Sequence, residues 1–178
     1  KQSIMQLKNL RNKIINLYDN VYDILTQDNS IIFSQPKFEA MQIELNTCGS
    51  NFIMLDLDLY IQPGFLDQIP TYAVYYPEPM FSAWYHQVIN GEYEKLNAPG
   101  WFTWKSTPVN CATIRINNPK LLQEYIDLFY SITAENLSEK EGHKAMIKEQ
   151  WSLGEFFNKH TIQYSTLYNP NYILYVTD

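Results

Sequence analysis

The stretch of the chain that most constrains its fold is Phe52–Tyr60, in which four apolar residues lead directly into Asp-Leu-Asp. A short apolar run of this kind predicts a strand buried on both faces, as in a parallel sheet, with carboxylates at its C-terminal end. Side chains two apart on an extended chain point the same way, so Asp56 and Asp58 are expected to present their oxygens together. Open α/β sheets bind their ligands at this end of the strands.

Two converging carboxylates suit a hard cation, Mn²⁺ or Mg²⁺, and such a cation in turn suits a diphosphate. Because a polar pair next to a buried strand is costly without a partner, we expect Asp56 and Asp58 to bind a metal ion. The alternative is an Asp-rich turn in which both carboxylates are solvated or cap a loop.

The length and the net charge of the chain limit the classes of protein to which it can belong. A chain of 178 residues fits a single domain, 1–178. A net charge of −6 and an isoelectric point near 5.0 disfavour nucleic acid as a partner, because phosphate binding needs a basic face. Because the chain is itself acidic, an anionic substrate would need a metal ion.

No apolar run reaches the length of about 18 residues that predicts a transmembrane segment.

The two cysteines, Cys48 and Cys111, have no metal-ligand spacing and follow no recognisable secretory leader. They predict a cytoplasmic chain with reduced thiols. We expect both to be small buried hydrophobic side chains.

Helices and strands alternate along the chain, which predicts an α/β fold with a mainly parallel sheet flanked by helices. The expected helices are 4–25, 36–47, 119–132 and 138–159, and the expected strands are 52–58, 71–76, 111–116, 161–167 and 172–176. Residues 77–108 are rich in proline and aromatic residues and predict a loop-rich insertion. Since the chain opens directly into a helix at its first residues, we expect it to be a portion of a longer protein.

With these pieces in order, the chain resembles the nucleotide-sugar-dependent glycosyltransferases of GT-A fold, and among them an uncharacterised glycosyltransferase-like group. The matching stretches are the Asp-x-Asp strand at 52–58, the strand Asn110–Asn118, the Glu-Gln helix start at Glu149–Leu153 and the helical lead-in Pro36–Ala40. The resemblance implies a nucleotide-diphospho-sugar transferase-like domain. A chain that starts inside a helix would lack the first nucleotide-binding strand of that fold.

The resemblance implies a site for a nucleotide sugar donor. Asp58 would be the more direct metal ligand, and Asp56 would contact the ribose or the metal. The Mn²⁺ or Mg²⁺ ion would bridge the diphosphate and act as a Lewis acid for the departing nucleoside diphosphate. Asn110 would approach the donor or the acceptor sugar from the neighbouring strand.

The same resemblance places Glu149 and Gln150 in the cleft, where they would bind sugar hydroxyls or supply a base. An inverting enzyme needs a carboxylate to deprotonate the hydroxyl of its carbohydrate or other acceptor. Glu149 is the first candidate for this catalytic role and Glu78 the second. The alternative for both is a solvated surface residue.

Histidine and aromatic side chains provide further candidates. A histidine could complete the metal site, or each could be a surface or capping residue; they are His86, His143 and His160. Aromatic rings could stack on acceptor sugars, or form a hydrophobic cluster under a long loop; they are Trp84, Tyr85, Trp101 and Trp104.

Two other functions remain open. The chain could be a non-catalytic GT-A-like domain that binds a carbohydrate or a partner protein. A hydrophobic strand ending in Asp-x-Asp also opens the haloacid-dehalogenase-type phosphatases, in which Asp56 would be the nucleophile and Asp58 the acid. The residues Leu59 and Tyr60 that follow do not fit the phosphatase pattern.

Overall fold

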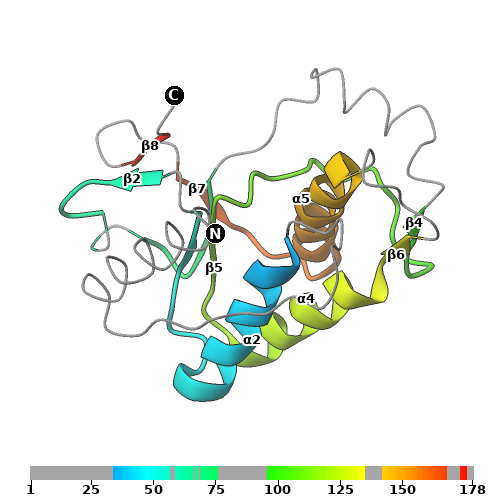
Figure 1. The fold of residues 1–178 in the computed structure, drawn as a ribbon, viewed down its shortest axis with the longest axis horizontal. Coiled ribbons are helices and arrows are strands. Elements are labelled where there is room, and N and C mark those ends of the chain that lie inside the picture. The colour runs from blue at the N-terminus through cyan, green and yellow to red at the C-terminus, as the bar shows by residue number, and fades with distance from the viewer. Residues whose placement is uncertain are drawn as a thin grey trace, which may run out of the picture.

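A computed structural model describes residues 34–56, 59–65, 67, 69–75, 96–134, 142–167 and 173–175 (Figure 1). At 96, 133–134, 142–147 and 173–175 it describes the backbone without the side chains. The expected helix 4–25 and the candidates Asp58 and Glu78 lie outside the described residues.

The fold is built on a mixed sheet of four strands in the order β1 (Met54–Leu55), β5 (Thr113–Ile116), β3 (Tyr72–Val74) and β7 (Ser165–Thr166). Strand β5 runs antiparallel to both β1 and β3, and β3 runs parallel to β7. Two further pairs of strands form separate two-stranded sheets. They are β2 (Leu59–Ile61) with β8 (Ile173–Tyr175), and β4 (Leu96–Asn97) with β6 (Thr133–Ala134).

The expected α/β class is confirmed, but a mainly parallel sheet does not describe these strands. The chain enters β5 between β1 and β3 and runs against both of them. An apolar run shows that a strand is buried and does not show its direction, which is why the prediction of a mainly parallel sheet was wrong.

Three helices cover the sheet: α2 (Gln35–Cys48), α4 (Pro119–Ser131) and α5 (Gly142–Lys159). Figure 1 shows them together on one side of β5, and α4 contacts both other helices. The expected start of α4 is confirmed, because the Asn118 side chain accepts a hydrogen bond from the Leu121 N–H at 3.1 Å. Helix α2 ends at Gly49, whose φ of 73° favours glycine.

The two faces of the sheet are buried in two different hydrophobic clusters. Val74 packs with the helices, including the stacked rings of Phe38 and Phe129, whose centroids lie 3.5 Å apart. The adjacent Ala73 and Tyr75 point to the opposite face and pack with other apolar residues, among them Phe65, Ile69 and Ala112. This alternation follows from the two-residue period of a strand. The expected two-sided burial of the strand at 52–58 is not confirmed, because β1 lies at the edge of the sheet and its two residues are only partly buried.

The expectations drawn from the cysteines and from hydropathy have mixed outcomes. Cys111 is buried as expected, but Cys48 is exposed, because it is the last residue of α2 and lies at the edge of the molecule. The two thiols are not joined in a disulfide. Among the helices described, none is both long and apolar enough to cross a bilayer.

The described part of the 77–108 insertion is anchored to α5. Glu155, only 2% exposed, accepts hydrogen bonds from the backbone N–H groups of Thr103, Lys105 and Ser106 at 2.9 to 3.2 Å. Next to it on the helix, Gly154 lies so close to the loop that an added Cβ would overlap the Thr107 carbonyl oxygen. The loop is therefore held against the helix by hydrogen bonds to the Glu155 carboxylate. It packs closely there because Gly154 has no Cβ atom.

We expect Gly154→Ala to destabilise the fold by about 1–3 kcal/mol, because the added methyl group must displace the backbone of Thr107. Urea unfolding followed by circular dichroism measures the change. Gly100→Ala is the matched control, since its Cβ meets nothing within 4 Å, and it should stay within about 0.5 kcal/mol of wild type. Equal stability of the two variants would show that the loop does not pack against the helix as described.

Candidate functional site

Four segments that are far apart in the sequence meet at the ammonium group of Lys37. Its Nζ lies 2.7 Å from Asp56 Oδ1 and 2.8 Å from Glu149 Oε1. It also donates a hydrogen bond to the Cys111 carbonyl oxygen at 3.1 Å. The structure thus brings Asp56 and Glu149, two of the predicted site residues, to a single cation.

Helix α2 directs Lys37 toward the sheet. Lys37 and Met41 are four residues apart and share one helix face, and Met41 and Phe38 are fully buried. The aliphatic part of the lysine therefore lies along the core, and the ammonium group reaches the end of β1. Its side chain is 15% exposed.

Glu149 is a buried acid, not the solvated helix residue that was its alternative. The residue is 7% exposed; its Oε2 accepts a hydrogen bond, whereas Oε1 has an ion-pair contact but no hydrogen-bond partner among the described residues. Ser34 Oγ donates to Oε2 at 2.6 Å, and Lys37 lies at Oε1. Ser34 precedes α2, but its side chain does not cap the helix. Its hydroxyl donates a hydrogen bond to Glu149 instead.

The pKa values of the buried pair shift in directions that favour different charge states. Burial alone would lower the pKa of Lys37, but Glu149, Cys111 and Asp56 outweigh it and hold that pKa well above its ordinary value. Burial raises the pKa of Glu149, although Lys37 and Ser34 act in the opposite direction. The raised pKa of Lys37 favours an ion pair, whereas the raised pKa of Glu149 favours a neutral glutamic acid. Because Lys37 contacts two carboxylates, we take its positive charge as the stable feature of the site.

Asp56 stands at the end of β1, where a ligand can reach it. Its backbone N–H donates to the Ala112 carbonyl at 2.8 Å, which ties it to the entry of β5. Its side chain is 35% exposed, in contrast to Glu149. Asn110 shapes the same region, since its Oδ1 accepts a hydrogen bond from the Ala112 N–H at 2.8 Å. Asn110 therefore lies in the turn before β5 and not on the strand itself, and this turn is joined to Asp56 through Ala112.

The donors for a metal ion are only partly within the described residues, because Asp58 is outside them. In the described ranges no three His, Cys, Asp or Glu side chains are grouped closely enough to hold a metal ion. Mg²⁺ is commonly bound through one or two carboxylates together with substrate phosphates. An exposed carboxylate such as Asp56 fits that kind of site, with the remaining oxygens supplied by a diphosphate.

Gln150 lies on another side of α5 from Glu149. Successive helix residues point about 100° apart, so the two side chains diverge. The Gln150 carbonyl accepts a hydrogen bond from the Val109 N–H at 3.3 Å, which holds the segment before β5 against the helix. Gln150 is thus near the site through its backbone and does not join the group around Lys37.

The described histidine and tryptophan candidates lie elsewhere. His160 Nε2 is 3.3 Å from Glu124 Oε2, in the contact between α5 and α4. One face of the Trp101 ring is covered by the Lys159 ammonium group, 4.1 Å from the ring centroid. Trp104 packs against the hydrophobic core. The alternatives of a surface histidine and a hydrophobic cluster fit these three side chains. Outside the described side chains are His86, His143, Trp84 and Tyr85.

Sequence reasoning assigned no role to Lys37 or Ser34. A signal was available for the lysine, because a charged residue shares a helix face with the apolar Met41 and Leu45 at four-residue spacing. A lysine on the buried face of a helix needs a carboxylate partner. No comparable signal marks Ser34, which resembles an ordinary residue at a helix start.

We expect Lys37→Met to destabilise the fold by about 3–5 kcal/mol, because it leaves the buried Glu149 without its counter-charge. Urea unfolding measures the loss. Adding Glu149→Gln to the same chain should recover a large part of it. Lys120→Met, at a side chain that is 87% exposed, is the control and should change little. A Lys37→Met variant as stable as wild type would contradict the ion pair.

The raised pKa of Glu149 predicts how stability depends on pH. A group whose pKa is higher in the folded state stabilises the fold below its unfolded value, about 4.3 for glutamate, and loses that contribution as pH rises through the folded value. We expect the stability of wild type relative to Glu149→Gln to fall above about pH 4 and then to level off. Urea unfolding at a series of pH values tests this. A relative gain with rising pH would instead show that the pair with Lys37 outweighs the cost of burial.

Comparison of the chain with protein-family models, with curated protein sequences and with solved structures gave no match. The function is therefore argued from the geometry around Lys37.

Proposed function

We propose that the chain is a metal-dependent glycosyltransferase domain that moves a sugar from a nucleotide-diphosphate sugar to an acceptor hydroxyl. One observation carries this proposal. The four stretches on which the resemblance to GT-A glycosyltransferases rests each contribute a group to a single cluster: Lys37, Asp56, the Cys111 carbonyl and Glu149. Residues that match by sequence order alone would have no reason to converge in space.

Asp56 is the accessible member of the cluster and is our candidate to face the donor, together with Asp58. A Mn²⁺ or Mg²⁺ ion held there would neutralise charge on the departing nucleoside diphosphate. Lys37 would fix the direction of the Asp56 carboxylate and add positive charge beside the diphosphate. Asn110, in the turn before β5, would approach the sugar.

The geometry favours a positioning role for Glu149 over the role of catalytic base. A base must come within hydrogen-bond reach of the hydroxyl that it deprotonates. Both oxygens of Glu149 are already engaged by Ser34 and Lys37 in a buried setting. We therefore assign Glu149 the task of holding the lysine in place, and Gln150 remains a candidate for sugar binding.

A second function is favoured by the same ion pair. The Asp56 carboxylate already has an ammonium partner at 2.7 Å, so a metal ion is not the only group that can stabilise its negative charge. A GT-A-like domain that binds carbohydrate or a partner without catalysis would have this arrangement.

Calorimetric titration of UDP and of GDP, with and without Mn²⁺, tests the proposal. We expect one of the nucleotides to bind only when Mn²⁺ is present. Asp56→Asn should weaken that binding by about 10–100-fold, because it removes a charged metal-site oxygen while preserving the shape of the side chain. Asp127→Asn, at an exposed aspartate on α4, is the matched control and should bind as wild type does.

The outcomes separate the two functions. Absence of binding by both nucleotides in every metal condition would overturn the transferase proposal and favour the non-catalytic domain. Nucleotide binding that is independent of Mn²⁺ and of Asp56 would contradict the donor site that we assign.

A further inference from the structure

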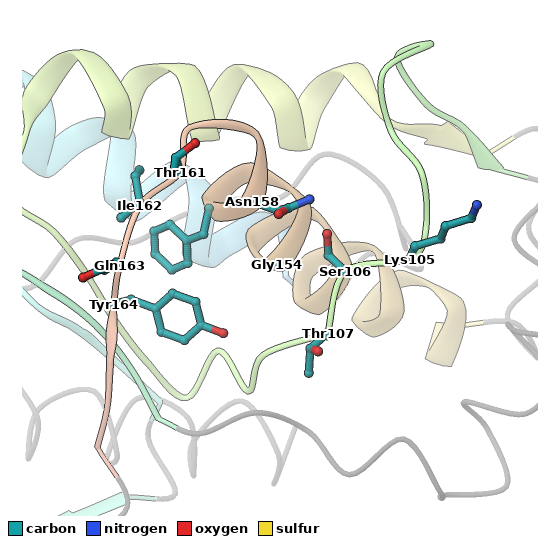
Figure 2. Close-up of a pocket in the computed structure, with 10 residues that line it drawn as sticks. Lys105, Ser106, Thr107, Gly154, Asn158, Thr161, Ile162, Gln163 and Tyr164 are labelled. Atoms are coloured by element: carbon teal, nitrogen blue, oxygen red, sulfur yellow. The ribbon is translucent and has the colours of Figure 1, made fainter.

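A pocket of about 550 Å³ lies beside the C-terminal half of α5, away from the Lys37 cluster (Figure 2). Its walls come from the loop at 105–107, from α5 and from the segment 161–164 that follows the helix. This volume is within the range of pockets that hold small molecules. Nothing in the proposed donor site uses it.

The lining of this pocket combines an aromatic wall with neutral polar groups. The Phe157 and Tyr164 rings stack with centroids 4.8 Å apart and an interplanar angle of 26°. Figure 2 shows the Tyr164 ring extending from its segment toward the loop that carries Thr107. Polar side chains on the walls include Ser106 and Asn158. An aromatic surface with hydroxyl and amide groups around it is suited to a sugar ring, which has apolar faces and a polar edge.

The charges of the lining limit the class of ligand. Lys105 is the one charged residue among those that line the pocket, and it is exposed. Without a carboxylate the lining offers little attraction to a cation. A single solvated lysine would tolerate an anionic group on the ligand, but the pocket does not need the ligand to carry one. A neutral, hydroxyl-rich molecule fits this balance.

Ser106 supplies an unsatisfied group at the pocket. Its Oγ is buried and has no hydrogen-bond partner among the described residues. A buried hydroxyl without a partner is costly, and rotation of the Ser106 side chain about χ1 would bring its Oγ to a ligand hydroxyl and remove that cost. The loop that carries Ser106 is already fixed by the bonds from its backbone to Glu155. The pocket wall is thus ordered before any ligand arrives, which reduces the entropy lost on binding.

We propose that this pocket binds a carbohydrate as the non-reacting part of the acceptor, a role that rests on the proposed transferase function. The sugar ring would lie on Tyr164, and its hydroxyls would bond with Ser106 and Asn158. Asn158 is nine residues from Glu149 on the same helix, which places the two roughly 14 Å apart along its axis and, at about 100° per residue, on opposite sides of it. An acceptor of a few sugar units that passes around α5 would span this separation. Gln150 points about 100° away from Glu149 and shares a helix face with Gly154, so it lies along such a path.

Saturation-transfer NMR and titration with lactose, maltose, cellobiose and chitobiose, without nucleotide or metal, test the pocket. We expect at least one disaccharide to bind saturably. Asn158→Ala and Tyr164→Leu should each weaken that binding at least fivefold. Asn46→Ala removes an equally exposed amide from α2 and is the matched control, which should bind as wild type does. Because Asn158 is exposed, its variant tests the pocket even if the Tyr164 variant fails to fold.

Absence of saturable binding by all four disaccharides would overturn the pocket proposal, and so would binding that both variants leave unchanged. The test is independent of the donor site. Sugar binding without any UDP or GDP binding would keep the pocket and overturn the transferase. Nucleotide binding with no sugar binding would keep the transferase and overturn the pocket.

Discussion

The contact between the Lys37 ammonium and the carboxylates of Asp56 and Glu149 links α2, the end of β1 and α5. Three charged groups are removed from much of their water here, and that loss is offset only if they remain close together. The positions of the three charged groups are therefore tightly constrained. Hydrogen bonds from Ser34 and to the Cys111 carbonyl complete the coordination of the group. A displacement of any one of the elements would leave a buried charge uncompensated, so the arrangement of the helices on the sheet depends on this contact.

Helix α5 presents different residues to the two regions of functional interest. Glu149 faces the lysine, while Gly154 and Glu155 hold the loop at 103–107. The loop continues to Val109, which bonds to the Gln150 carbonyl, and then into the turn before β5. One helix thus fixes both the wall of the pocket and the start of the strand beside Asp56. The two regions therefore share one helix as a frame, which under the proposed function would hold a donor and an acceptor in register.

Local sequence signals predicted the elements well. The start of α4 after Asn118 and the extents of α2 and α4 depend on residues close in sequence. The candidate site was only partly predictable, because its contacts join distant residues. Ser34 and Glu149 are 115 positions apart, and their meeting depends on how α2 and α5 pack on the sheet. The direction of β5 was likewise beyond a pattern that reports burial alone. Asp56 was predicted from the apolar run that leads into it, and Glu149 from the resemblance of the chain to a family with a defined cleft.

Under the proposed function, Lys37 affects how a metal ion and a nucleotide reach Asp56. An ammonium group at 2.7 Å from the carboxylate repels an approaching divalent cation at short range. The same charge attracts a diphosphate, which carries negative charge of its own. A cation that arrives with the diphosphate is therefore favoured over a cation alone. Under the proposed function the lysine would therefore make the site selective for the complex of metal and nucleotide, and it would hold the Asp56 carboxylate in position until that complex binds.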